Sequence, residues 1–208
     1  MDYYEQIKFN EIYLPAREER FQQWIAPNGT YQIALPIAAA LFGLGKRERV
    51  VDVGANVGLI SRVFSILYEE VIAFEPSPQN RACLSRNLAP EFNNVVIYPY
   101  ALGSSEARSW INETSSNCGG DALVQTDMSS SSSLPGCKPV VVKTLDKILK
   151  GDRFSALKID VQGGELDVLR GGERVIQENK PVILVESEGK SGDKNYDNLK
   201  EIDEVIGK

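Results

Sequence analysis

Four acidic residues follow or interrupt apolar runs in this sequence. Asp52 lies in VVDVG, Glu75 ends VIAFE, Asp160 ends LKID, and Glu165 comes shortly after. A charged group at the end of an apolar strand must face water, a partner or a ligand. The chain contains no histidine, so a general base has to be a carboxylate, Lys, Tyr, Cys or a water. These acids are the first candidates for ligand binding and for proton transfer.

The stretch VVDVGANVG, which begins at Val50, predicts a strand that turns sharply into a helix. Gly54 and Gly58 follow Asp52 as D-x-G-x-x-x-G, and glycine at such a corner lets the backbone approach a ligand. The dinucleotide fingerprint G-x-G-x-x-G has a glycine where this chain has Asp52. A carboxylate there repels a pyrophosphate and suits a cationic ligand with an amine and a sulfonium. A purely structural turn is the alternative.

Glu75 adds a second element of a nucleoside pocket. It ends the next predicted strand, 23 residues after Asp52, where an acid can accept both hydrogen bonds from a ribose diol. Asp160 and Glu165 belong to LKIDVQGGE and are expected on the same rim. Helix capping is the alternative for Glu165, since an acid near a helix N-terminus stabilises the helix by about 0.3–1 kcal/mol. Capping explains Asp160 less well.

A sheet whose strands end at one edge would bring these acids together. From residue 50 onward, short apolar runs alternate with helical patterns, as is typical of α/β folds. The runs are VVDV, VIAF, VVIYPY, ALKIDV and PVILVE, and their largely continuous apolar character predicts parallel strands buried on both faces. Helices are predicted after Gly58, over 78–88 with Ser77 as N-cap, over 165–177 and over 193–206. Ligands bind at the carboxyl ends of such strands.

The length of 208 residues suits one globular domain, 1–208. Residues 1–45 predict a mainly helical lead-in, 46–188 a cofactor-binding core and 189–208 a terminal helix. The Ser- and Gly-rich segment 112–139 is interpreted as an insertion. It is either a mobile loop or a loop over the active face that orders when ligand binds.

Composition excludes several classes of protein. The net charge of −6 argues against a nucleic-acid-binding surface. The longest apolar run, 33–44, is too short to span a bilayer, and the acidic start does not fit a signal peptide. Cys83, Cys118 and Cys137 lack metal-binding spacing and are expected to be free thiols. We expect a cytoplasmic protein that binds no membrane or nucleic acid, and we assign no metal-ligating residues.

In their order and spacing these motifs resemble the FkbM family of S-adenosylmethionine-dependent methyltransferases. The similarity covers residues 50–186, about two-thirds of the chain, and rests on VVDVGANVG, VIAFEPSP, YALGS, VKTLDKIL, LKIDVQGGELDVLRGG and PVILVE. The resemblance implies a Rossmann-like, doubly wound, mostly parallel sheet flanked by helices. It also implies S-adenosylmethionine as cofactor and methyl transfer to a hydroxyl of a sugar or another small molecule.

The resemblance also assigns roles to individual residues. The implied cofactor contacts are Asp52, Gly54, Asn56 and Gly58 at the methionine end, Glu75 at the ribose, and Ala101 with Leu102 near the adenine. Asp160 would face the methyl group and the acceptor. In the absence of histidine, Asp160 is the first candidate to receive or relay the acceptor's proton, and Glu165 is the second.

Two departures from the family pattern leave alternatives open. Gln162 replaces the middle acid of the usual D-V-E-G-A-E. The terminal strand pair that normally closes the sheet is not predicted, so either the fold is shortened or a partner chain, such as a second copy, covers that edge. A cofactor-binding or catalytically silent partner module is therefore the second hypothesis. A nicotinamide-dependent oxidoreductase is the third, disfavoured by Asp52 in the phosphate position.

Overall fold

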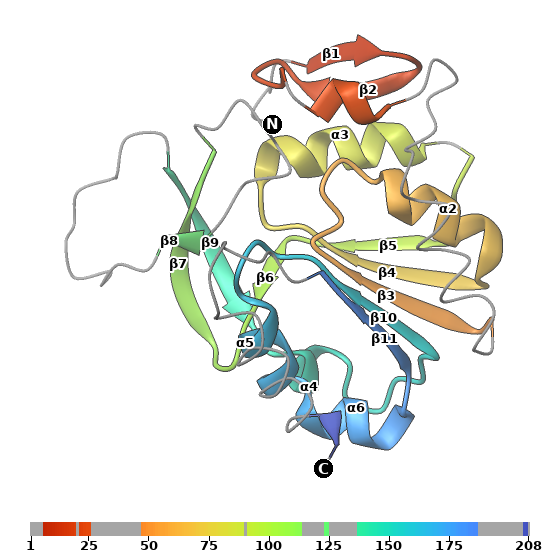
Figure 1. The fold of residues 1–208 in the computed structure, drawn as a ribbon, viewed down its shortest axis with the longest axis vertical. Coiled ribbons are helices and arrows are strands. Elements are labelled where there is room, and N and C mark those ends of the chain that lie inside the picture. Colours follow the sequence, from red (N-terminus) through yellow and green to blue (C-terminus); the bar gives the residue numbers. More distant parts are fainter. Residues whose placement is uncertain are drawn as a thin grey trace.

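A computed structural model describes residues 6–19, 21–25, 47–89, 91–113, 123–124, 137–186 and 206–207. At its centre is a five-stranded sheet of order β11-β10-β3-β4-β5 in which all neighbours run parallel (Figure 1). Its strands are β3 (Arg49–Val53), β4 (Glu70–Phe74), β5 (Val95–Tyr98), β10 (Ala156–Ile159) and β11 (Val182–Val185). The strand order reverses between β3 and β10, as in doubly wound sheets. The predicted Rossmann-like fold class is confirmed.

Helices cover both faces of this sheet (Figure 1). One face carries α2 (Leu59–Leu67) and α3 (Pro78–Leu88), and the other carries α4 (Leu145–Ile148), α5 (Glu165–Arg170) and α6 (Glu173–Asn179). Side chains of a strand alternate between faces, so Val51 and Val53 pack toward α4–α6 while Val50 packs toward α2. The same alternation directs Asp52 toward α2.

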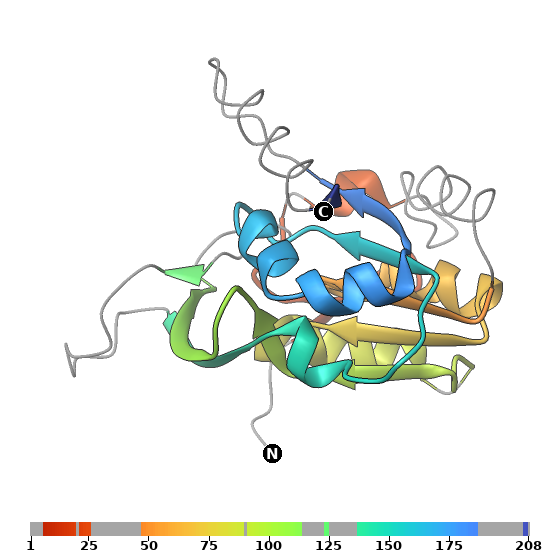
Figure 2. The same cartoon turned by 90° about the horizontal axis from the view of Figure 1, so that it is seen from below.

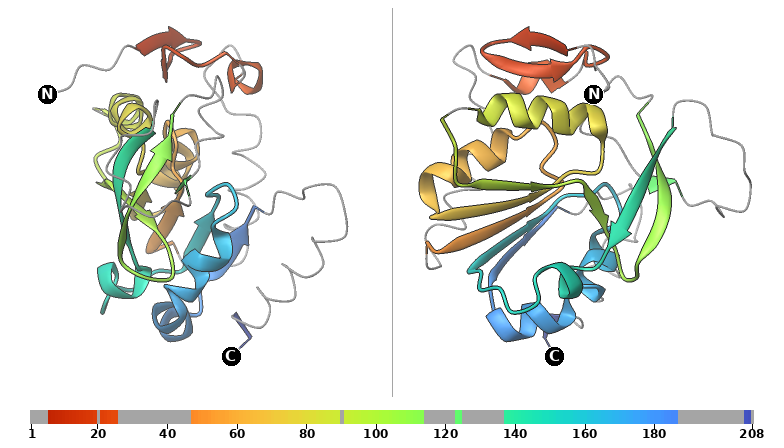
Figure 3. Two further views of the ribbon diagram at one scale, coloured as in Figure 1. Left: turned by 90° about the vertical axis from the view of Figure 1, so that its left-hand side faces the viewer. Right: turned by 180° about the vertical axis from the view of Figure 1, so that it is seen from behind.

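The described start of the chain is not helical, contrary to expectation. β1 (Gln6–Phe9) and β2 (Ile12–Pro15) form an antiparallel hairpin, and the 3-10 turn η1 (Phe21–Trp24) follows. Asn10 and Glu11 take positive φ values of 46° and 67° between the strands, which is the geometry of a tight two-residue hairpin turn. The hairpin lies against α3 (Figure 3). Cross-strand hydrogen bonds therefore replace the expected helical lead-in over these residues.

A second sheet, which the sequence did not predict, has the order β6-β9-β7-β8. Its strands are β6 (Tyr100–Leu102), β7 (Ala107–Asn112), β8 (Leu123–Val124) and β9 (Cys137–Lys143). Pro99 divides the predicted run VVIYPY between β5 and β6, because proline has no N–H to continue a ladder. Only this residue separates the two strands, so the second sheet begins at the carboxyl end of the main sheet (Figure 2).

The predicted helices after Gly58 and over 78–88 are confirmed. The helix expected over 165–177 is instead two, α5 and α6, which meet at Gly171. A Cβ on Gly171 would lie 2.0 Å from the carbonyl oxygen of Gly103, so the second sheet packs closely there. Most of 112–139 and of the predicted terminal helix lies outside the described residues, and no described strand extends the main sheet past β11. No described helix is long and apolar enough to cross a membrane.

Candidate active site

The corner after β3 depends on two glycines with positive φ. Gly54 has φ 77° and Gly58 has φ 88°, values that residues with a Cβ rarely adopt. A Cβ on Gly54 would lie 1.8 Å from the carbonyl oxygen of Asp160, and one on Gly58 would lie 2.4 Å from the side chain of Leu84. Both glycines are therefore required by the packing of the corner against the end of β10 and against α3.

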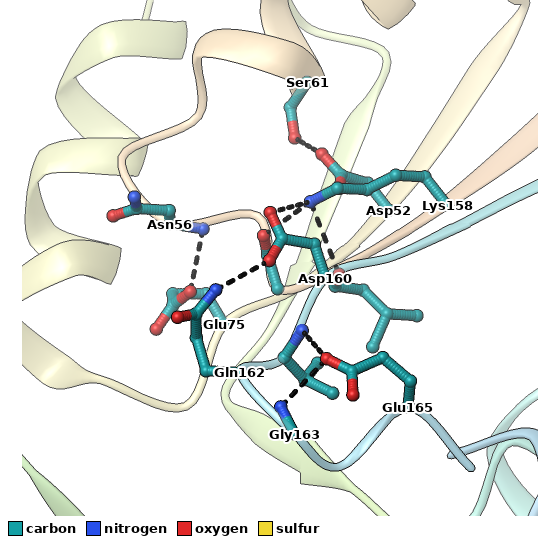
Figure 4. A network of polar contacts seen from close by, with 12 residues as sticks. Asp52, Asn56, Ser61, Glu75, Lys158, Asp160, Gln162, Gly163 and Glu165 are labelled. Carbon is teal, nitrogen blue, oxygen red and sulfur yellow. Dashed lines mark hydrogen bonds and ion pairs between the residues drawn. The ribbon is translucent and has the colours of Figure 1, made fainter. Parts of the chain in front are cut away.

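Asp52 is fully buried, with 0% of its surface exposed. Its Oδ2 accepts a hydrogen bond from Ser61 Oγ at 2.6 Å, and its Oδ1 lies 3.1 Å from Lys158 Nζ (Figure 4). The contact with Lys158 is an ion pair without the alignment of a hydrogen bond. The charge that was expected to select a cationic ligand is thus paired with a cation of the chain itself.

Lys158 connects the corner with the end of β10. It is opposite Asp52 in the strand register and only 3% exposed. Its Nζ donates to the Gly54 carbonyl oxygen at 2.8 Å and lies 3.6 Å from Asp160 Oδ2. Burial lowers the pKa of Lys158, but the charges of Asp52 and Asp160 outweigh burial and raise the pKa above 10.5. Lys158 was not among the residues expected from the sequence, although a lysine inside the apolar run ALKI was a visible signal.

Of the two acids that pair with Lys158, Asp160 is the one that reaches the surface, with 24% of its side chain exposed against 0% for Asp52. Its Oδ1 accepts a hydrogen bond from Gln162 Nε2 at 3.1 Å (Figure 4). An ionised acid in place of Gln162 could not donate this bond, so the departure from the family pattern has a structural consequence. An amide and an ammonium hold the Asp160 carboxylate while part of it remains open, as a proton acceptor requires.

Glu165 supports the turn that carries Asp160. Its Oε1 accepts hydrogen bonds from the backbone N–H groups of Val161 at 3.2 Å and Gly163 at 3.0 Å. Glu165 is also the first residue of α5, where a negative charge stabilises the helix. Glu165 thus holds the turn that precedes α5, and this role favours Asp160 over Glu165 as the proton acceptor.

Glu75 binds the backbone on both of its sides and is 4% exposed. Its Oε2 accepts from the Asn56 N–H at 2.7 Å, and its Oε1 accepts from the Ser77 N–H at 2.8 Å. Asn56, with φ 53°, has a buried Oδ1 without a hydrogen-bond partner among the described residues. Glu75 therefore fixes the corner relative to β4.

Ala101 and Leu102 lie on β6 and are each 5% exposed. Ala101 packs with Ile111, Val140 and Val142, while Leu102 belongs to the core beneath α4–α6. Their side chains are thus part of the interior. If Ala101 and Leu102 contact adenine as predicted, they do so through the backbone of β6.

An open hollow of about 700 Å³ lies at the other end of the main sheet. Its lining includes Arg49, Glu70 and Asp152, and Arg49 pairs with both acids. Ligands of open α/β sheets bind at the carboxyl ends of the strands, whereas Arg49 and Glu70 begin β3 and β4. We therefore place the candidate site at the acids and not at this hollow. In the described part of the chain, no group of three or more Cys, Asp or Glu residues is arranged to hold a metal ion.

A doubly wound sheet with a glycine corner and acids at neighbouring strand ends defines the class of nucleotide- and nucleoside-binding α/β proteins. Within that class, the chain belongs to the FkbM methyltransferase domain family, which matches residues 52–207. It is 28% identical over 174 residues to methyltransferase sdnD of Sordaria araneosa, covering 69% of this chain and 67% of that protein. It is 28% identical over 138 residues to hexuronic acid methyltransferase AglP of Haloferax volcanii, covering 64% of this chain and 53% of that protein.

Two solved structures share the fold. Methyltransferase FkbM from Methylobacillus flagellatus KT matches with a TM-score of 0.54 and 19% identity, over 90% of this chain and 52% of that one. Precorrin-6y C5,15-methyltransferase from Geobacter metallireducens GS-15 matches with a TM-score of 0.50 and 13% identity, over 84% of this chain and 71% of that one. The chain thus spans about half to two-thirds of the length of several of its relatives. The predicted family is confirmed.

Proposed function

We propose that this chain binds S-adenosylmethionine at the carboxyl ends of β3, β4 and β10 and methylates a hydroxyl of a sugar or another small molecule. The observation that carries the proposal is Glu75, a buried acid that directly follows β4, fixes the glycine corner and lies at the strand end where an acid binds a ribose diol in doubly wound folds. Membership of the FkbM methyltransferase domain family supports the reaction class. The hexuronic acid methyltransferase among the relatives supports a sugar-like acceptor.

The residues of the site fit such a cofactor. Glu75 would hold the ribose hydroxyls. Asn56 Oδ1, which has no hydrogen-bond partner among the described residues, would accept a hydrogen bond from the amine of the methionine end. Asp52 would act indirectly, because Lys158 and Ser61 occupy its carboxylate. When bound, S-adenosylmethionine supplies an activated methyl group on a sulfonium.

The chain itself aligns the cofactor with the acceptor and takes up the proton of the acceptor hydroxyl. Asp160 takes or relays the proton of the acceptor hydroxyl, and Gln162 together with Lys158 keeps its carboxylate in place. Alignment of two reactants is effective by itself, since well-oriented systems reach effective molarities of about 10⁵–10⁸ M. Glu165 contributes through the turn at 161–163 and not through the reaction.

Calorimetric titration with S-adenosylmethionine tests the binding step. We expect wild type to bind and Glu75→Gln to bind at least about 10-fold more weakly, because the amide offers one acceptor oxygen where two are used. Glu70→Gln is the matched control, since Glu70 begins the same strand and pairs with Arg49 far from the site. Its affinity should equal that of wild type. Absence of binding to wild type would overturn the proposal.

A methyl-transfer assay separates an enzyme from a binding module. Labelled S-adenosylmethionine would be offered with a panel of uronic acids and hexoses, and product would be followed as label transferred to the sugar. The proposal expects transfer to at least one hydroxyl. Tight cofactor binding without transfer to any hydroxylated compound would favour the catalytically silent partner module instead.

A further inference from the structure

Glu113 is a buried acid that the proposed mechanism does not use. It directly follows β7 and is 4% exposed. Its Oε1 accepts hydrogen bonds from Ser77 Oγ and, with poorer geometry, from the Gln79 N–H at 3.4 Å. Its Oε2 is buried and has no hydrogen-bond partner within the described ranges. One oxygen of this carboxylate is therefore accounted for and the other is not.

Capping of α3 does not explain the second oxygen. The N-cap of α3 is Ser77, whose hydroxyl oxygen already accepts from the Asn80 N–H at 3.2 Å. A carboxylate that only assisted this cap would need Oε1 alone. A buried acceptor without a donor is unfavourable, and such groups in native proteins normally pair with a ligand, a water or another residue. Oε2 thus points to a missing donor.

The position of Glu113 relative to Glu75 suggests which donor is missing. Ser77 joins the two acids, because its N–H binds Glu75 Oε1 and its hydroxyl binds Glu113 Oε1. Asn56 binds the other oxygen of Glu75. Asn56 and Glu113 therefore flank Glu75, and each has a buried oxygen without a partner in the described part of the chain.

We propose that Glu113 accepts a hydrogen bond from the exocyclic amine of the adenine of bound S-adenosylmethionine. This inference rests on the proposed function. The cofactor is linear, with its ribose between the methionine and the base. If Glu75 holds the ribose and Asn56 the methionine end, the base falls on the side of Ser77 and Glu113. The amine is the N–H donor of adenine, and it matches an acceptor oxygen. Since Oε2 is covered in this structure, side chains over it must move when the base enters.

The test compares the demethylated cofactor with an analogue that differs from it only at the base. S-Adenosylhomocysteine carries the amine, and S-inosylhomocysteine carries a keto oxygen in its place. By calorimetry, wild type should bind the adenosyl compound about 10-fold or more tightly, because a buried acceptor rejects a keto oxygen in the place of the amine donor. In Glu113→Ala the ratio of the two affinities should fall to about one. Glu113→Gln should also bind both alike, since its amide can face either group.

Glu106→Gln is the control, because Glu106 is an acid near β7 that forms ion pairs with Lys143 and Lys147. It should keep the wild-type ratio. Circular dichroism melting would establish that each variant is folded, and Glu113→Gln carries the test if the alanine variant is not. A reduced melting temperature with an unchanged affinity ratio would show that Glu113 only stabilises α3 and would overturn the inference. Failure of wild type to bind S-adenosylhomocysteine would reject the proposed function together with it.

Discussion

Asp52 and Asp160 each lie at the end of an apolar run in the sequence, but their environments in the structure differ. Asp52 lies within its strand and faces α2, where Ser61 and Lys158 satisfy it. Asp160 lies one residue beyond its strand and remains partly exposed. A buried charge requires a partner, and the partner of Asp52 comes from the chain. Asp160 is consequently the acid of this pair that can still meet a substrate.

Replacement of Asp160 should separate chemistry from binding. Asp160→Asn keeps an oxygen that can accept from Gln162 Nε2, but the amide cannot take a proton. We expect methyl transfer to fall by about 100-fold or more, while affinity for S-adenosylhomocysteine changes little. Turnover with labelled cofactor and calorimetry on the same protein would measure the two effects.

The companion variant is Glu165→Gln, whose amide oxygen can still accept from Val161 and Gly163. It should retain most of the methyl transfer. If Glu165→Gln lost activity as completely as Asp160→Asn, the proton acceptor would be Glu165 and its role in the turn at 161–163 would be secondary.

At the scale of elements, the register between β3 and β10 decides the electrostatics of the site. It places Lys158 opposite Asp52, and both side chains lie on the face that α2 covers. The raised pKa of Lys158 has a defined effect on stability. Its contribution is complete below the unfolded value of 10.5 and is lost as the pH rises through the higher folded value. The pair therefore stabilises the fold throughout the neutral range.

A double variant tests this pairing. Lys158→Met leaves the Asp52 charge buried without its cation and should lower the free energy of unfolding by about 3–5 kcal/mol. Asp52→Asn combined with Lys158→Met removes both charges and should recover most of that loss. Urea denaturation of wild type, both single variants and the double variant would measure the coupling. Purely additive losses would contradict an ion pair.

At the scale of the whole molecule, Asn87 ties three parts of the chain together. Its Oδ1 accepts from the Tyr13 N–H at 2.7 Å, and its Nδ2 donates to the Tyr13 carbonyl oxygen at 2.9 Å and the Val57 carbonyl oxygen at 2.7 Å. Asn87 therefore joins the hairpin β1–β2, helix α3 and the glycine corner. The hairpin also contacts the corner directly, because Ile12 and Leu14 pack in one apolar cluster with Val57 and Leu59.

Asn87→Ala should lower the free energy of unfolding by about 1–3 kcal/mol, because buried backbone groups lose their partners. It should also weaken S-adenosylhomocysteine binding, since Val57 belongs to the corner. Asn94→Ala is the matched control, because Asn94 donates to the carbonyl oxygens of Ser65 and Tyr68 away from the site. It should reduce stability without reducing affinity. Equal affinities of the two variants would show that the hydrogen bonds of Asn87 do not support the corner.

The sequence alone determined the main sheet, the first two of its helices and the edge where the acids lie. Parallel strands buried on both faces must be apolar, and a helix that begins with proline carries a recognisable cap. The signals for these elements therefore lie within their own short stretches of sequence. Ser77 and the bounds of α3 illustrate this, since the predicted and observed helix agree.

Only the tertiary structure decided how the acids are used. The partner of Asp52 is 106 residues away in the chain, and a one-residue change of register would turn Lys158 to the other face. The contacts of Glu165 with the turn at 161–163 and the donor role of Gln162 likewise depend on which groups lie nearby. The same holds for Glu113 Oε2, which is buried without a partner in the described part of the chain. Local pattern specifies where charges occur, whereas long-range packing decides which of them are neutralised and which stay available for a ligand.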